Sequence, residues 1–173
     1  MTSFIENKLT GQTIVFLSES GVKDELVMKM SYNRKGTPPP MHYHSYQEEY
    51  FTVLSGQLEL TMDGSTKKLE AGEGFVVPTN TPHAMWNGRD GYTEVKWLVH
   101  PALNTAAFFR EAFELSNLQW AKGKSDLHWK DKIRLAYLFR KEIRLVGLPF
   151  VVVRVLFFVL FPLGFIRKEE KSS

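Results

Sequence analysis

The sequence predicts a mainly β fold, a closed barrel or a sandwich, followed by C-terminal α-helices. Between Gln12 and Pro101 the chain consists of short apolar segments broken by turns about every 8 to 12 residues, with no helical period that persists. After Pro101 the apolar residues recur at helical spacing. With 173 residues, of which 43% are hydrophobic, the chain has the size of one domain and can bury a core.

The strands of this β fold are predicted from apolar alternation and from turn residues. Residues 48–64 predict two consecutive strands, and Asp63-Gly64 at their end is typical of a hairpin turn. Other apolar runs, alternating or continuous, predict strands around residues 15–17, 26–28, 75–78 and 95–99.

Helices are predicted in the C-terminal part of the chain. Phe109 and Phe113 lie four residues apart in a predicted helix over 103–115, with Asn104 or Thr105 as its N-cap. A second helix is predicted over 131–146, with its apolar residues on one side. We therefore divide the chain into a β domain, an amphipathic helical extension, and a hydrophobic, basic-flanked helix and tail, over residues 1–101, 102–146 and 147–173.

The composition excludes several kinds of site. The chain has no cysteine, which excludes disulfides, thiolate zinc sites, iron–sulfur clusters and cysteine nucleophiles, so any metal must be held by His, Asp or Glu. The net charge is +3, and the basic excess lies entirely within residues 130–173. Because these basic residues alternate with aliphatic and aromatic ones, they favour contact with a membrane surface over nucleic acid, and we expect no nucleic-acid partner.

The apolar run at residues 145–166 has three interpretations. It contains 17 Val, Ile, Leu or Phe residues among 22, with Arg154 as its only charge, and is long enough for a spanning helix. Pro149 and Pro162 interrupt it, which favours a helix lying in the membrane interface. The third interpretation is a helix packed on its own domain or on a partner subunit. The first residues lack a basic, apolar leader, so we expect a cytoplasmic protein, with the inner membrane as a place of attachment for the C-terminal helix.

Four residues form a candidate metal site. His42 and His44 are separated by one residue, so on a strand both side chains leave the same face. Glu49 shares the parity of the apolar Phe51 and therefore points inward, where a buried carboxylate needs a partner. His83 follows a Thr-Pro turn into another strand. Three imidazoles and one carboxylate suit one divalent ion of Fe, Mn, Ni, Cu or Zn.

The spacing of these residues resembles the two motifs of the cupin superfamily. The first motif, G-x5-H-x-H-x4-E-x6-G, is matched by Gly36, His42, His44, Glu49 and Gly56. The second, G-x5-P-x-G-x2-H-x3-N, is matched by Gly72, Pro78, His83 and Asn87, with Asn80 in place of the usual glycine. Asn tolerates positive φ better than most residues, so the turn is preserved. The spacing between the motifs is similar to that of small bacterial monocupins.

The resemblance implies a double-stranded antiparallel β-barrel of the cupin or jelly-roll type, similar to quercetin dioxygenase-like cupins, with a helix after the barrel. It assigns the ligand roles to His42, His44, Glu49 and His83, and it implies a homodimer.

Two functions are compatible with the sequence. The first is a metal-dependent oxygenase, dioxygenase-like, that acts on a small weakly polar or aromatic molecule. Its substrate pocket is expected to be lined by inward apolar side chains, namely Phe51, Val53, Leu60, Met85 and Trp97. The second is a non-catalytic module that binds a metal or ligand and is attached to a membrane or a partner protein through its C-terminal helices. The residues reveal no separate catalytic group, which keeps both hypotheses open.

Overall fold

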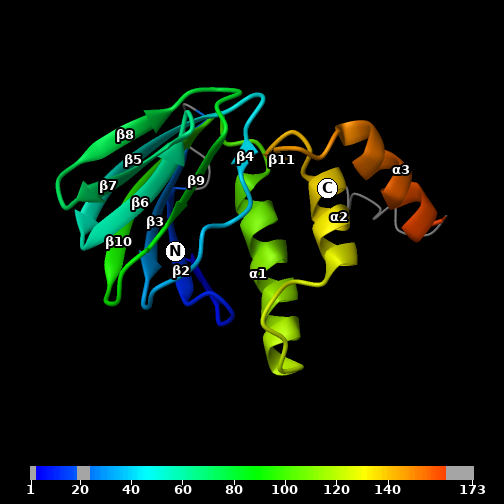
Figure 1. Ribbon diagram of the computed structural model, residues 1–173, viewed down its shortest axis with the longest axis horizontal. Helices are drawn as coiled ribbons and strands as arrows, with labels where there is room; N and C mark the ends of the chain where they lie inside the picture. The colour runs from blue at the N-terminus through cyan, green and yellow to red at the C-terminus, as the bar shows by residue number, and fades with distance from the viewer. Residues whose placement is uncertain (1–2, 19–23, 163–173) are drawn as a thin grey trace, which may run out of the picture.

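The protein is built from two antiparallel β-sheets and three C-terminal helices (Figure 1), and the computed structural model describes residues 3–18 and 24–162. The larger sheet contains, in spatial order, β1 (Ser3–Asn7), β2 (Gln12–Ser18), β3 (Leu26–Tyr32), β10 (Thr93–His100), β5 (Glu48–Ser55) and β8 (Gly74–Val77). The smaller sheet contains β11 (Arg144–Leu145), β4 (His42–Tyr43), β9 (His83–Trp86), β6 (Gln57–Met62) and β7 (Ser65–Glu70). The prediction of a mainly β, jelly-roll fold with helices after it is confirmed, and the strands pair within two separate sheets.

The chain passes from the larger sheet to the smaller one at Gly56, between β5 and β6. Gly56 has a φ of 76°, and a Cβ atom added there would lie 2.4 Å from the carbonyl oxygen of Tyr92. Only glycine fits this conformation and this close backbone approach. The predicted hairpin follows at once, because Asp63 and Gly64 both have positive φ and join the paired strands β6 and β7.

The core lies between the inner faces of the strands and follows their alternation. In β10, Val95, Trp97 and Val99 are all buried, as the alternation predicts. In β2 the buried residues are Ile14 and Phe16, which pair with the equally buried Met30 and Met28 of β3, so residues 15 and 17 belong to the outer face.

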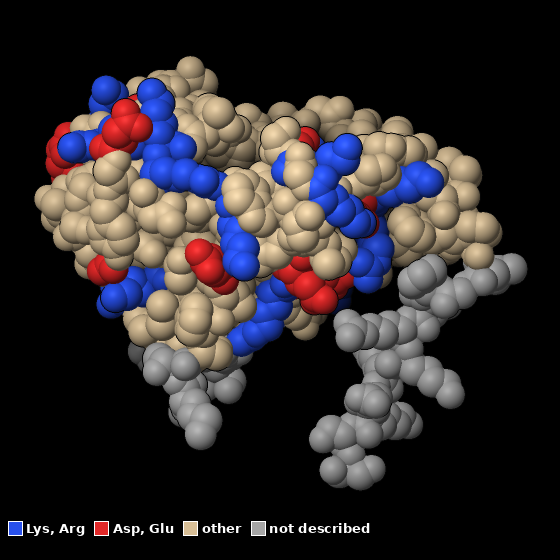
Figure 2. All heavy atoms as spheres, turned by 90° about the horizontal axis from the view of Figure 1, so that it is seen from below, with Lys and Arg blue, Asp and Glu red and all other residues tan. Residues whose placement is uncertain are grey.

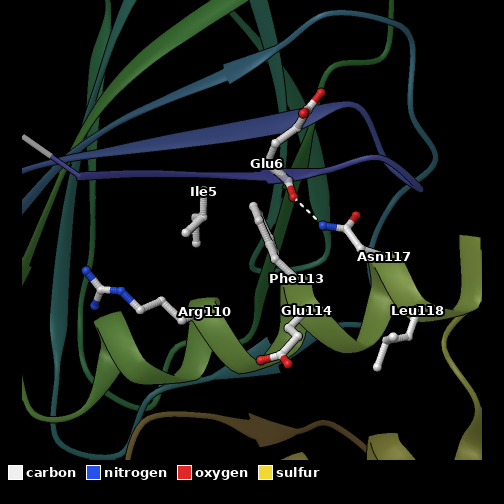
Figure 3. A pocket seen from close by; sticks show the side chains of 7 residues that line it. All are labelled: Ile5, Glu6, Arg110, Phe113, Glu114, Asn117 and Leu118. Atoms are coloured by element: carbon white, nitrogen blue, oxygen red, sulfur yellow. Dashed lines mark hydrogen bonds between the residues drawn. The ribbon is translucent and has the colours of Figure 1, made fainter. Parts of the chain in front are cut away.

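The first predicted helix is present as α1 (Thr105–Ala121), which begins where expected and continues six residues beyond Leu115. It packs along the edge strand β1, as Figure 3 shows. Asn117 bridges the two elements, because its Nδ2 donates to the carbonyl oxygen of Glu6 at 2.7 Å and its Oδ1 accepts from the Lys8 amide at 2.8 Å. These bonds occupy part of the edge of the sheet and fix α1 beside it.

The second predicted helix is shorter than expected and is followed by a strand. α2 (Trp129–Leu138) ends eight residues before Val146, and residues 144–145 form β11 instead. β11 pairs with β4, with Leu145 opposite His42. Backbone pairing with the sheet therefore replaces the last two turns of the predicted helix, and part of the region assigned to the helical extension belongs to the smaller sheet.

The apolar tail contains α3 (Phe150–Leu160), which is 11 residues long. Its Val153 and Phe157 are buried, and the ring of Phe157 stacks on Tyr137 of α2 with centroids 4.0 Å apart. Within residues 3–18 and 24–162, no helix has the length and apolar character needed to cross a membrane. The predictions for residues 163–173 lie outside the described residues.

Candidate metal centre

Three histidines converge from neighbouring strands of the smaller sheet. His42 on β4 lies directly opposite His83 on β9 in the antiparallel register, and His44 follows two residues after His42. One ring nitrogen from each of the three lies within 4.8 Å of the others, which is close enough for a shared ion. The His-x-His spacing brings its two side chains to one face, as the sequence predicted.

A backbone carbonyl fixes the orientation of each imidazole. The Nδ1 atoms of His42 and His83 lie 3.0 Å from the carbonyl oxygens of Pro40 and Thr81, respectively. The Nδ1 of His44 bonds the carbonyl oxygen of Glu142, which is 98 residues away in the chain. A carbonyl only accepts, so each Nδ1 donates its proton to one, and the Nε2 of each ring remains available for another contact.

Glu49 lies beside these rings at the inner face of β5 and is only 2% exposed. Its Oε2 is 3.2 Å from the Nε2 of His44 and 3.0 Å from the Nε2 of His83. The Nε2 of His44 and the Oε2 of Glu49 are both buried without a hydrogen-bond partner. An Nε2 lone pair that faces a carboxylate oxygen is repelled by it unless a positive charge lies between the two atoms. The donor set therefore fits a bound cation.

The pKa values reflect this arrangement. Burial lowers the pKa of His42 to about 4, and the neighbouring His83 and His44 add to the shift. Burial alone would lower the pKa of His44, but the carboxylate of Glu49 more than offsets this and raises it. Burial also disfavours a charged Glu49, yet His44 and His83 beside it hold its pKa below the usual value. At neutral pH the cluster contains a neutral His42 and an ionised Glu49, which are the ligand forms that metals require.

The cluster opens into a cavity of about 220 Å³ between the sheets and the C-terminal segments. Among the residues expected to line a pocket, Met85 and Trp97 line this cavity. The other three, Phe51, Val53 and Leu60, are buried but lie in the hydrophobic core, outside the residues that line the cavity. Strand parity correctly identified which side chains point inward. It did not show that the cavity occupies only part of the inward face, so these three side chains pack in the core beyond it.

Much of the cavity wall comes from residues outside the predicted β domain. α1 contributes Thr105, Phe108 and Phe109, and the segment around β11 contributes Glu142, Ile143 and Leu145. Further walls come from the N-terminal strands and from the segment that leads into β4, namely Gln12, Met30, Tyr32, Pro39 and Pro40. Sequence reasoning did not identify these residues, because they carry no motif.

Glu142 has the clearest structural role among the residues that the sequence did not reveal. Its side chain is buried, with 3% exposure, and its Oε1 accepts from the backbone N and the Nδ2 of Asn104 at 3.1 and 3.2 Å. Asn104 is the N-cap residue of α1. The carboxylate thus anchors, at the start of α1, the segment whose carbonyl holds His44.

The positions of the second motif also have clear local roles. Asn80, which replaces the usual glycine, has a φ of 61°, so it adopts the conformation that glycine favours. Asn87 is fully buried, and its Nδ2 donates to the carbonyl oxygens of Arg34 and Gly91. These residues shape the loops around the site and contribute no ligand.

Comparison with known proteins agrees with these observations. Residues 28–101 match the family described as Cupin domain. The chain is 36% identical over 63 residues to Polyketide synthase CurC of Streptomyces cyaneus, covering 36% of this chain and 41% of that protein. It is 30% identical over 104 residues to Quercetin 2,3-dioxygenase of Bacillus subtilis (strain 168), covering 59% of this chain and 30% of that protein.

The matched regions span less than half the length of either relative. Among solved structures, KdgF from Halomonas sp. is similar with a TM-score of 0.47 and 16% sequence identity, covering 56% of this chain and 84% of that one. The motif residues, the two-sheet fold around them and the family match together show that residues 28–101 belong to the cupin superfamily, and that C-terminal helices follow this cupin domain.

Proposed function

We propose that this cupin binds one divalent transition-metal ion through His42, His44, Glu49 and His83, and that it is a dioxygenase-like enzyme for a small weakly polar or aromatic molecule. The observation that carries the proposal is the convergence of three imidazole nitrogens within 4.8 Å of one another at the wall of a cavity, with the buried carboxylate of Glu49 beside two of them, those of His44 and His83. A redox-active ion bound there would supply dioxygen activation, and a redox-inert one would supply Lewis acidity.

The cavity itself supports a weakly polar ligand. Its walls are mostly aromatic and aliphatic, with Met85, Phe108 and Ile143 on different sides of the cluster. Trp97 also lines it, and the indole Nε1 is buried without an acceptor in the protein. A ligand oxygen that accepts this N–H would satisfy the donor and orient an aromatic ring along the wall. The relative named as a quercetin dioxygenase supports the same substrate class.

The experiment combines metal analysis with oxygen uptake. Purified full-length protein is loaded with each of the five candidate metals in turn and assayed by oxygen electrode against a panel of hydroxylated aromatic compounds. Metal-dependent oxygen uptake with at least one compound is the expected result. His42→Ala and Glu49→Gln should lose bound metal and uptake together, while His100→Asn, which changes an exposed histidine on β10, should keep both. Full metal occupancy in both ligand variants would contradict the ligand assignment.

A non-catalytic binding function is the second candidate, and one observation favours it. Outside the cluster, the ionisable side chains that line the cavity are Tyr32 and Glu142. Burial raises the pKa of Tyr32, so its hydroxyl keeps its proton at neutral pH, and the Oε1 of Glu142 is already engaged by the backbone N and the Nδ2 of Asn104. A protein that binds metal and an aromatic ligand but consumes no oxygen and forms no product would support this function over the enzyme.

A further inference from the structure

The outward-facing side of α3 is an exposed apolar surface. Val151, Val155, Phe158 and Val159 have exposed fractions of 71, 57, 54 and 68%. Their spacing of four, three and one residues places them on one side of the helix, opposite the buried Val153 and Phe157 that pack on α2. We call these four residues, together with Arg154 among them, the α3 outer patch. An exposed, contiguous apolar surface of this kind marks a site of interaction.

The part of the chain that contains this patch carries an excess of positive charge. Residues 130–162 contain seven Lys or Arg side chains and two acidic ones, Asp131 and the buried Glu142. Lys132 and Arg134 are paired with the carboxylates of Asp126 and Glu111, so five of the seven cations have no such partner among the described residues. Arg140 lies over the ring of Tyr137 at 5.3 Å, and Arg144 lies over the ring of Phe150 at 4.1 Å, so both cations are held where α2 meets α3. Figure 2 shows this end of the molecule as a largely tan surface with blue side chains next to it.

A symmetric contact between two copies of α3 does not suit this patch. Such a contact would place Arg154 of each copy in the same apolar interface, and residues 143–162 contain no acidic side chain to pair with it. An unpaired charge in an interface is costly. Among the described residues Arg154 has no carboxylate partner, so the patch requires a surface that offers both hydrocarbon and negative charge.

We propose that the α3 outer patch binds the surface of an anionic lipid bilayer. With 11 residues, α3 is about 16 Å long, roughly half the thickness of a hydrocarbon core, so it lies in the plane of the interface. Its valine and phenylalanine side chains enter the boundary of the acyl chains, while Arg154 extends to the lipid phosphates. Arg140 and Arg144 add attraction to the anionic head groups. The inference is independent of the metal centre and of its chemistry.

Vesicle co-sedimentation of the full-length chain tests the proposal. The protein should sediment with vesicles that contain about 30% phosphatidylglycerol in phosphatidylcholine, and much less with pure phosphatidylcholine. Val155→Ser combined with Phe158→Ser should weaken binding about tenfold or more, because two apolar side chains no longer enter the interface. Arg154→Glu should weaken binding to the anionic vesicles about tenfold.

The matched control is Val76→Ser combined with Leu54→Ser, which removes two side chains of similar exposure, 46 and 44%, from the larger sheet. These variants should bind vesicles like the unchanged protein. Absence of sedimentation with anionic vesicles would overturn the proposal, as would equal binding by the α3 variants. A solution dimer that dissociates when Val155 and Phe158 are replaced would also overturn it, because the patch would then be a protein interface.

Discussion

The carboxylate of Glu142 offers a direct test of how the C-terminal segment supports the metal centre. Glu142→Ala removes the acceptor of two hydrogen bonds from Asn104, at 3.1 and 3.2 Å, and leaves these donors facing a small void. Loss of a buried acceptor costs about 1–3 kcal/mol of unfolding free energy. The carbonyl that orients His44 belongs to the same residue, so the change should also loosen that ring.

We expect Glu142→Ala to lower metal affinity by about 10- to 100-fold, the usual effect of losing a group that orients a ligand. Chelator competition measures the affinity, and urea unfolding of the metal-free protein measures the stability change. Glu142→Gln keeps an acceptor oxygen for Asn104 and should therefore retain most of the metal affinity and of the stability. Glu114→Ala changes an exposed glutamate of α1 and should alter neither the metal affinity nor the stability. If Glu142→Ala loses stability but binds metal as tightly as the unchanged protein, the segment does not position His44.

Three further outcomes follow from the structure. Gly56→Ala should lower the unfolding free energy, measured by urea titration, by about 2 kcal/mol or more. The reason is that residue 56 has a positive φ and that the new Cβ would meet the carbonyl oxygen of Tyr92. Unchanged stability would refute this argument. Phe157→Ala removes the ring stacked on Tyr137 and should lower the unfolding free energy by about 3 kcal/mol. Urea unfolding, monitored by tyrosine and tryptophan fluorescence, measures this change. A loss below measurement error would show that α3 does not pack on α2 as described. Dialysis of metal-loaded protein against a chelator should lower the midpoint of thermal unfolding, because an ion that binds only the folded chain stabilises it. The Glu49→Gln variant should show little change on the same treatment. An equal drop in the midpoints of the variant and the unchanged protein would indicate that the ion binds at a different site.

The sequence predicted the parts of the site that depend on local spacing. His42 and His44 share a strand face whatever the rest of the fold does, and the x4 spacing to Glu49 brings the next strand into the same motif. The hairpin at Asp63-Gly64 follows from turn chemistry in the same way.

The features of the fold and of the site that the sequence did not predict depend on contacts between residues far apart in the chain. Residues 143–146 continue an apolar period that suits a helix, and only their pairing with β4 makes residues 144–145 a strand. Alternation reveals which face a side chain belongs to but not its depth between two sheets, so Phe51 and Val53 were expected in the pocket and lie in the core. In β2 the apolar run includes both parities, and the register with β3 selects Ile14 over Val15.

The bond between His44 and Glu142 has a consequence for the order in which the protein matures. The two residues are 98 positions apart, and Glu142 lies near the end of the described chain. Every residue of the cupin motifs is synthesised before Glu142, whose carbonyl oxygen orients the ring of His44. This ring therefore acquires its last partner only after the other residues of the cluster have been made, and a fragment ending after β10 would contain all four residues of the candidate metal site without the carbonyl that orients His44.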